Sequence, residues 1–438
     1  MSAFNVGLTG LNAAQTDLNV TGNNIANVAT TGFKQSRAEF GDLFAQSFAS
    51  SSKTAVGQGA NVLSVTQLFS PGPIELTNNG LDLAISGNGF FVLDDPNGSR
   101  VYSRAGEYQV DRDGYITNTS GQRLQGFDPL DETDSNTTFS VGSPQDIQLT
   151  TSKIEPKATT TIDSIVNLDA NAEVPPGVVA GGTFAFPDPT PDTYNFSTQV
   201  TTYDSLGTPR PVTLFFQRTD AGGGVADPLN WDLYVGMTDD DPASATFGQV
   251  VDVGSAAPQN ITFDALGQLT TADPVITISS INDPFLDNGA NGFVDLPVNL
   301  AGSTQYDGDN EVSITADGYT SGQLSGINVD ETGRVFAQFT NNQSKVLSQV
   351  ALANFINPQG LAQLGDNNWQ ETYASGGVSI GAPATAGLGS IQSSALEGSN
   401  VDLAEQLVNL ITGQRNYQAN AKTLETANAI TQTILNIR

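Results

Sequence analysis

The chain opens with the stretch FNVGLTGLNAAQTDLNVTGNNI at residues 4–25 and closes with DLAEQLVNLITGQRNYQANAKTLETANAI at residues 402–430. In both stretches apolar residues recur every seven positions, as in a helix that buries one stripe against another helix. The repeating residues are Phe4, Leu11, Leu18 and Ile25, with Leu8 beside them, and Leu403, Leu410, Tyr417 and Leu424, with Leu407 beside them. We therefore predict helices over residues 3–29 and 400–437, each with a coiled-coil seam.

The remaining faces of the two predicted helices are polar but almost uncharged. Asn, Thr and Gln stand where a solvent-exposed helix usually carries Glu and Lys. Gly7, Gly10 and Gly22 lower the helix propensity of the first stretch, so we expect it to be marginal on its own. Ser399-Asn400 is expected to cap the second helix. A helical hairpin within one molecule is the alternative, but contact with further copies accounts better for the missing charge.

The long middle of the chain predicts short strands joined by turns. Apolar runs alternate with Pro-Gly, Asn-Gly and Gly-Asn-Gly breaks, and Asp113-Gly114 lies between two alternating runs as a hairpin turn does. The segment DRDG at 111–114 also begins like a calcium loop. Its twelfth position holds Gln122 instead of the bidentate Glu that calcium requires, so we predict a turn and no metal site.

Together these patterns predict a mainly β multidomain protein with long α-helices at both termini that form coiled coils. Residues 71–150 and 304–390 are similar in character, so we expect one domain split by an insertion, in a nested, discontinuous arrangement. The predicted parts are terminal helices at 1–30 and 396–438, a connector at 31–70 and 386–395, a first β domain at 71–152 and 304–385, and an inserted outer β domain at 153–303. Such nesting would bring both termini to one end.

Charge and composition exclude several classes of function. The net charge is −30, and because residues 1–70 sum to zero and residues 391–438 to −1, nearly all of it belongs to the interior. This balance argues against binding nucleic acids or anionic membranes. There is no Cys or His, which excludes disulfides, zinc–thiolate sites and imidazole catalysis. We expect no enzyme activity, no cofactor, no cleaved signal peptide and no membrane span.

Three internal stretches stand out beside the two ends of the chain, LAISGNGFFVL, YSRAGEYQVDRDGYITN and TYDSLGTPRPVTLFF. Individual residues of note, which we call the family signature, are Asn23, Asn24, Asn27, Gly32 and Phe33 near the start, Gly87 and Gly89 inside the chain, and Ser399, Asn400, Gln414, Arg415 and Asn420 near the end. In these stretches and residues the chain resembles the flagellar axial proteins, and among them the hook subunits.

The resemblance implies a structural subunit that polymerises into a curved hollow tube, a universal joint passing torque from rod to filament. It implies unfolded export through the flagellar type III apparatus, an extracellular place in the flagellum, and the rod, hook cap and hook–filament junction proteins as partners. Asn5, Asn12 and Asn19, which repeat every seven residues, are then expected to face the channel. The alternatives are a rod or junction subunit, or, in a different class, a secreted acidic β-rich adhesin.

Overall fold

The chain divides into two compact units in the computed structural model. The structure describes residues 2–43, 57–131, 137–140, 142–149, 153–181, 183–220, 226–240, 242, 244–253, 258–270, 275–278, 289–290 and 295–436. Unit 1 comprises residues 1–151, 325–338 and 344–438, and unit 2 comprises residues 152–324 and 339–343. Both ends of the chain therefore belong to unit 1. Residues 44–56 of the predicted connector lie outside the described residues.

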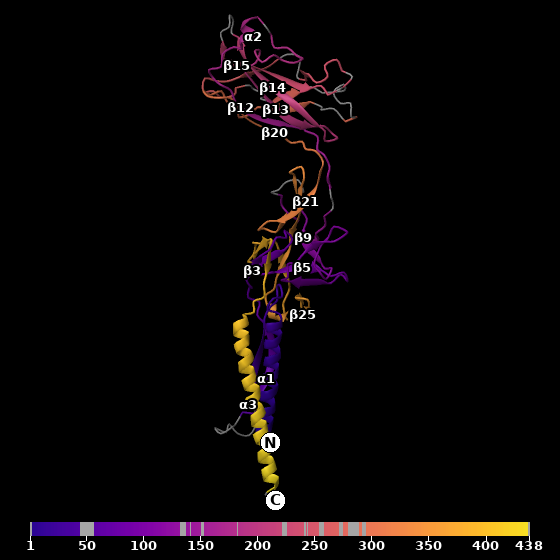
Figure 1. Cartoon of the computed structure of the whole chain (residues 1–438), viewed down its shortest axis with the longest axis vertical. Helices are drawn as coiled ribbons and strands as arrows, with labels where there is room; N and C mark the ends of the chain where they lie inside the picture. The colour runs from indigo at the N-terminus through magenta and orange to yellow at the C-terminus, as the bar shows by residue number, and fades with distance from the viewer. Residues whose placement is uncertain are drawn as a thin grey trace. The chain divides into compact units, whose positions relative to one another are not determined.

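The two predicted terminal helices are present in unit 1. α1 spans Ser2–Ala26 and α3 spans Leu403–Asn436. Figure 1 shows them side by side, with the N- and C-termini at the same end of the pair. They run antiparallel, because Gly7 lies against Leu424 whereas Leu18, further along α1, lies against Gly413.

The cap of α3 differs from the prediction. Asp402 accepts hydrogen bonds from the backbone N–H groups of Ala404 and Glu405, at 2.8 and 3.2 Å, and so caps the helix. The prediction of a cap at Ser399-Asn400 is wrong, because the Asn400 side chain is bonded elsewhere, to the connector that follows α1. Asn400 and Asp402 both offer a capping side chain, and the contacts of Asn400 with the connector leave the role to Asp402.

The β part of unit 1 is built on a sheet of short strands with the order β21-β22-β23-β9-β5-β6-β26-β25. The strands of unit 1 are β1 (Ser36–Asp42), β2 (Ala60–Gln67), β3 (Ile74–Leu76), β4 (Leu83–Ser86), β5 (Phe90–Asp94), β6 (Arg100–Ser103), β7 (Gln109–Val110), β8 (Ile116–Thr117), β9 (Arg123–Phe127), β10 (Gln145–Asp146), β21 (Gly322–Val329, shared with unit 2), β22 (Arg334–Phe339), β23 (Ser344–Val350), β24 (Leu352–Asn354), β25 (Ala362–Gly365), β26 (Asn368–Gln370), β27 (Ser379–Gly381), β28 (Ser390–Ser393) and β29 (Ala395–Glu397), with a short helix η1 (Pro358–Gly360). Strands β1 and β2 form a separate antiparallel hairpin that contacts α1.

Strand β5 is buried on both faces and anchors the core of unit 1. Phe91 and Leu93 belong to one apolar cluster, and Phe90 and Val92 belong to another. Successive side chains of a strand point to opposite faces, so the apolar run FFVL places one pair in each cluster. The turn predicted at Asp113-Gly114 is confirmed between β7 and β8.

Unit 2 is a sandwich of two sheets over one core. One sheet has the order β18-β19-β12-β20, and the other has the order β13-β14-β15-β16, with β17 paired to β15. Both contribute to a single buried cluster that includes Val298, Leu214 and Trp231. The elements are β11 (Lys153–Ile154), β12 (Ile162–Asn167), α2 (Pro176–Val179), β13 (Phe196–Tyr203), β14 (Pro209–Asp220), β15 (Ala226–Thr238), β16 (Val250–Asp252), β17 (Gln259–Thr262), β18 (Val275–Ile278), β19 (Leu296–Asn299) and β20 (Glu311–Ala316).

The boundary of unit 2 lies beyond the end predicted for the inserted domain. Unit 2 continues to residue 324, whereas the prediction ended the insertion at residue 303. The reason is strand β20, which pairs with β12 along its whole length, from Glu311 opposite Asn167 to Ala316 opposite Ile162. Residues 304–324 are thus held to unit 2 by the sheet. The four-part division as a whole stays a prediction.

Asp317 directly follows β20 and binds the segment before β12. From this contact we predict that the stability of unit 2 depends on pH. Burial raises the pKa of Asp317, but hydrogen bonds from Thr160 and Thr161 and the Lys157 ammonium outweigh burial and hold this pKa well below its usual range. A carboxyl with a lowered folded-state pKa contributes stability above its unfolded pKa and loses it as the pH falls.

We therefore expect Asp317→Asn to lower the melting temperature of unit 2 at pH 7 and to lower it by clearly less at pH 2, because the stabilising effect of the carboxylate decreases as the pH approaches its lowered folded-state pKa. With Trp369→Phe as background, the other tryptophan, Trp231, reports unit 2 by fluorescence. An equal loss at both pH values would contradict this assignment.

Candidate assembly surface

The segments that join the two helices to the β part of unit 1 meet at a buried ion cluster. Glu397, at the end of β29, accepts a hydrogen bond from Lys34 Nζ at 2.6 Å and another from Arg104 at 3.1 Å. The side chains of Lys34 and Glu397 are fully buried, and that of Arg104 is nearly so. Glu397 thus connects the chain leaving α1, the chain entering α3 and the end of strand β6.

Both cations of this cluster are shifted by their surroundings. Burial lowers the pKa of Lys34 and of Arg104, and the negative charge of Glu397 opposes the shift in each case. The backbone completes the network, since Lys34 also donates to the carbonyl of Ser70 and the N–H of Gly72 donates to Glu397, both at 2.9 Å. A carboxylate between two buried cations is costly to remove, because two unpaired charges would remain.

Two glycines of the family signature permit close backbone contact at this cluster. Gly32 has φ +68°, and a Cβ there would lie 2.6 Å from the backbone nitrogen of Ala105. Its N–H donates to the carbonyl of Glu397 at 2.7 Å. Gly87 has φ +118°, and its carbonyl accepts from Arg104 at 3.0 Å. Any side chain at Gly32 would push the end of α1 away from the cluster.

Two asparagines of the signature hold the helices to the connector. Asn24 near the end of α1 pairs with Ser36 through both backbone groups, at 2.8 and 2.9 Å, and donates to Gln406 of α3 at 3.1 Å. Asn400 accepts from the N–H of Gln35 at 2.7 Å and donates to the carbonyl of Leu68 at 2.8 Å. The two asparagine side chains thus form hydrogen bonds with backbone N–H and C=O groups of the connector, which is too irregular to pair these groups with its own backbone.

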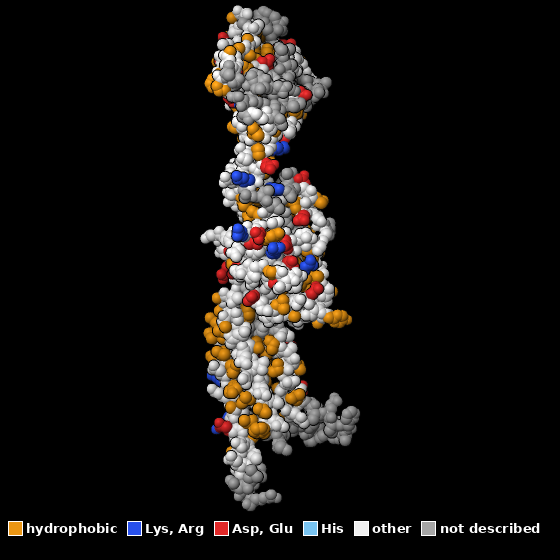
Figure 2. All heavy atoms as spheres, turned by 90° about the vertical axis from the view of Figure 1, so that its right-hand side faces the viewer, with side chains coloured by type: hydrophobic (Ala, Val, Ile, Leu, Met, Phe, Trp, Pro, Cys, Tyr) orange, Lys and Arg blue, Asp and Glu red, His pale blue; other side chains and the backbone are white. Residues whose placement is uncertain are grey.

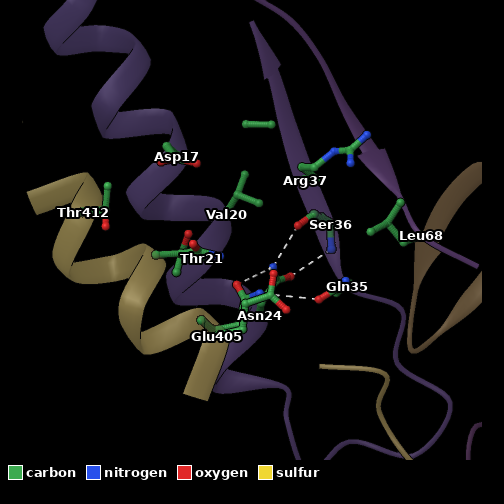
Figure 3. A pocket seen from close by; sticks show the side chains of 13 residues that line it. Asp17, Val20, Thr21, Asn24, Gln35, Ser36, Arg37, Leu68, Glu405 and Thr412 are labelled. Carbon is green, nitrogen blue, oxygen red and sulfur yellow. Dashed lines mark hydrogen bonds between the residues drawn. The ribbon is translucent and has the colours of Figure 1, made fainter. Parts of the chain in front are cut away.

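A polar hollow of about 280 Å³ lies between α1, the start of α3 and strand β1 (Figure 3). Asp17, Thr21 and Asn24 of α1 line it, opposite Glu405 of α3 and Arg37 of β1. Burial raises the pKa of Asp17. Among the described residues no group of three or more acidic side chains is placed to hold a metal ion, and no described helix is long and apolar enough to cross a membrane.

The helices touch mainly along rows of small and polar residues. Gly7, Ala14 and Thr21 are the buried row of α1, and Gln406 and Gly413 are buried on α3. A Cβ at Gly10 would come within 2.7 Å of the Asn420 side chain, and one at Gly413 would lie 3.0 Å from Leu18. The helix axes therefore approach closely, with little apolar area between them.

The predicted seam only partly enters this contact. Leu18 and Leu424 lie against glycines of the opposite helix, whereas Leu403 and Leu407 at the start of α3 are each 44% exposed. A straight α-helix turns a heptad row by about 20° per repeat, so a row that faces α1 at Leu424 has turned away from it three repeats earlier.

Large apolar side chains of both helices are therefore left in water, and those at the start of α3 are neighbours on one face of the helix. On the face shown in Figure 2, hydrophobic side chains gather over the helix pair and charged ones are sparse. The exposed large apolar residues of the two helices are Phe4, Val6 and Leu8 of α1 and Leu403, Leu407, Val408, Ile411, Tyr417 and Ile430 of α3. Leu11, Ile25 and Leu410 are half-buried. Such a patch is typical of a protein–protein contact.

The remaining predicted residues are distributed over unit 1. Asn5, Asn12 and Asn19 are exposed on α1, and Gln414 and Arg415 are exposed on α3. Asn27, directly after α1, donates to the carbonyl of Asn23 in the last turn of the helix, and Gly89 has φ +128° before β5. Phe33 and Ser399 are buried at the joint. Sequence reasoning missed Arg104, whose pairing with Glu397 across 293 residues has no local pattern.

Four family models match the chain in succession. They are "Flagella basal body rod protein" at residues 4–34, "Flagellar hook protein FlgE/F/G D1 domain" at 84–165, "Flagellar basal body protein FlaE D2 domain" at 167–319 and "Flagellar basal body rod FlgEFG protein C-terminal" at 392–437. The second and third fall largely within the β regions of units 1 and 2 respectively. These matches define the class as flagellar axial structural proteins.

Comparison with full-length relatives assigns the chain to one family within this class. The chain is 35% identical over 445 residues to "Flagellar hook protein FlgE" of Escherichia coli (strain K12) and 36% identical over 438 residues to that of Salmonella typhimurium, with all of each chain covered. The chain belongs to the flagellar hook protein family. A crystal structure of Helicobacter pylori flagellar hook protein FlgE2 has a similar fold, with a TM-score of 0.52 at 15% identity over 74% of this chain and 100% of that one.

The ion cluster predicts the effect of one substitution. We expect Glu397→Gln to lower the free energy of unfolding of unit 1 by ~3–5 kcal/mol, because Lys34 and Arg104 would stay buried without a counter-charge. Glu75→Gln is the matched control. Glu75 is exposed on the paired strand β3, and its loss should cost less than about 0.5 kcal/mol.

The measurement is urea denaturation followed by Trp369 fluorescence in a Trp231→Phe background, which isolates unit 1. Equal stability of the Glu397→Gln and Glu75→Gln proteins would show that the cluster does not hold the joint.

Proposed function

We propose that copies of this chain polymerise by covering each other's exposed helix faces, and that the polymer is the hollow, curved hook between flagellar rod and filament. The observation that carries the proposal is the apolar face of α3. Leu407, Val408 and Ile411 are 44–63% exposed and turned away from α1, although α1 is the helix available to cover them. Identical neighbours supply the missing cover.

The energetics favour assembly through these faces. Complete burial of one Leu, Ile or Val side chain contributes about 1.5–3 kcal/mol, and residues 1–70 and 391–438 carry almost no net charge to oppose contact. A head-to-tail contact between different surfaces of identical copies does not close on itself and produces a helical filament. In this proposal the terminal helices form coiled coils between copies.

In this proposal one part of the chain holds the polymer together and another part allows the polymer to bend. The helices and the joint at Glu397 would form the tight inner layer, while the β regions, which carry most of the −30 charge, would face outward. Repulsion between acidic outer surfaces keeps their mutual contacts weak and lets them slide. A tube with a firm inner layer and a yielding outer one can bend while it passes torque, as a universal joint must.

Export and partners follow from the same surfaces. A chain without cysteine has no disulfide to obstruct unfolded passage through a type III export channel. The small contact rows of α1 and α3 bury little apolar area, so the helix pair is marginal in a single copy, and premature polymerisation is limited. The rod, the hook cap and the hook–filament junction proteins are the proposed partners, with the hook outside the cell as the location.

The asparagine row of α1 supports the position of the channel. Asn5, Asn12 and Asn19 are exposed on α1. A polar wall without charge would hold neither charged nor apolar cargo, so export to the growing filament would continue through the tube.

Substitutions that place negative charge on the exposed face of α3 test the proposed polymerisation. We expect Leu407→Glu with Ile411→Glu to raise the protein concentration needed for polymerisation at least tenfold, because two carboxylates would have to be desolvated in the contact. Leu407→Met with Ile411→Leu keeps the face apolar and should polymerise normally. Sedimentation and electron microscopy of salted-out protein give the answer, and normal tubes from the charged variant would refute the proposal.

The channel assignment has its own test. Replacing Asn5, Asn12 and Asn19 with Leu should leave hook assembly intact and slow filament growth beyond it, because apolar walls would retain unfolded cargo. Filament length on cells that carry the variant is the readout, and unchanged filaments would refute a channel-facing row.

A further inference from the structure

A rigid apolar knob projects from the β part of unit 1, close to the helix pair. We define the knob as residues 356–360 and 372–376, the two segments that flank the hairpin of β25 and β26. Ile356 is 91% exposed and Tyr373 is 105% exposed, so both side chains lie almost entirely in water. Among the large apolar residues that the structure describes, these two have the highest exposed fractions.

The backbone of the knob is fixed although its tips are bare. Asn357 of the first segment binds the second segment twice, with its N–H donating to the carbonyl of Ser375 at 3.2 Å and its side-chain amide donating to the carbonyl of Ala374 at 3.0 Å. Ser375 is completely buried and bonds back to Thr372 at 2.7 Å. A rigid platform that presents a tyrosine and an isoleucine loses little conformational entropy on binding, which is the property of an interface hot spot.

The knob lies level with the first turns of α3. Gln363 of β25, which directly follows the knob's first segment, lines a hollow with Thr16, Asn19, Val20 and Asn23 of α1. This part of α1 is the part that contacts α3 between Gln406 and Gly413. The knob and the exposed face at Leu407, Val408 and Ile411 therefore lie at the same height along unit 1, yet within one copy neither covers the other.

Arg415 of α3 offers an opposite charge to the acidic residues beside the knob, although Asp402 and Glu405 are also exposed at the start of that helix. Residues 356–376 carry Asp366 and Glu371 and no Lys or Arg. The face of α3 carries Arg415, one turn beyond Ile411 and exposed, in a chain with 16 cations against 46 acids. An arginine beside a tyrosine ring adds a cation–π contact when the ring is covered.

We propose that the knob of one copy docks on the α3 face of a neighbouring copy, with Tyr373 packed against Val408, Ile411 and Arg415. The occupant is a second copy of this chain, and the inference rests on the proposed polymerisation. Because knob and helix face are different surfaces, the contact is heterologous and propagates from copy to copy. It also ties the β part of one subunit to the helix layer of the next.

The absence of cysteine from the natural chain allows a direct test. A Tyr373→Cys protein should react rapidly with a maleimide as a monomer and at least tenfold more slowly as a polymer. Ser99→Cys, on the exposed turn between β5 and β6, should react at similar rates in both. A double variant, Tyr373→Cys with Val408→Cys, treated with a short bis-maleimide should give a ladder of covalent oligomers from polymer and none from dilute monomer.

The outcomes separate the inference from the function on which it rests. If the unmodified chain forms no polymer, the proposed function fails. If it polymerises but the thiol at position 373 stays as reactive as in the monomer, or the double variant gives no ladder, docking of the knob on α3 is refuted alone. As a further check, Tyr373→Phe should polymerise like the natural chain, whereas Tyr373→Glu should need several times more protein.

Discussion

The ion cluster of Glu397 with Lys34 and Arg104 is the constraint on which the rest of unit 1 depends. It joins the chain leaving α1, the chain entering α3 and strand β6 at one buried point. Charges so thoroughly removed from water are held in one geometry, because any displacement leaves a cation unpaired. The directions in which the two helices leave the β part, and hence the faces they turn to water, follow from this fixed joint.

The contact between α1 and α3 buries only part of the apolar surface of the two helices. Its contact rows consist of glycine, alanine and polar residues, so α1 and α3 approach closely while most of their large apolar side chains stay outside the contact. A polymer subunit must not assemble too early and must still bind its neighbours, and this arrangement is compatible with both requirements. We propose that a single copy buries too little apolar area to hold its helices firmly, and that a neighbouring copy binds to the side chains left exposed. The proposal that assembly completes the folding of each subunit rests on family membership and on these exposed side chains.

The sequence predicted the terminal helices and the mainly β middle, because heptad spacing and turn residues are local signals. It also supplied the apolar residues that remain exposed, and the signature residues that prove to form the joint. It did not predict which face of each helix meets the other, since the drift of a heptad row on a straight helix and the close approach at Gly10 and Gly413 become visible only in three dimensions. The pairing of Glu397 with Arg104 and the pairing of strand β20 with β12 are likewise non-local, and so is the contact of Asn400 with the connector that leaves the helix cap to Asp402.

The most direct test of the central claim is a helical reconstruction of the polymer by electron cryo-microscopy at side-chain resolution. The account predicts that Leu403, Leu407 and Ile411 of each copy are buried against a neighbouring copy, while the cluster around Glu397 is intact and unchanged within each copy. A polymer in which these side chains line the water-filled channel, or in which the helices separate from the joint at Glu397, would contradict it.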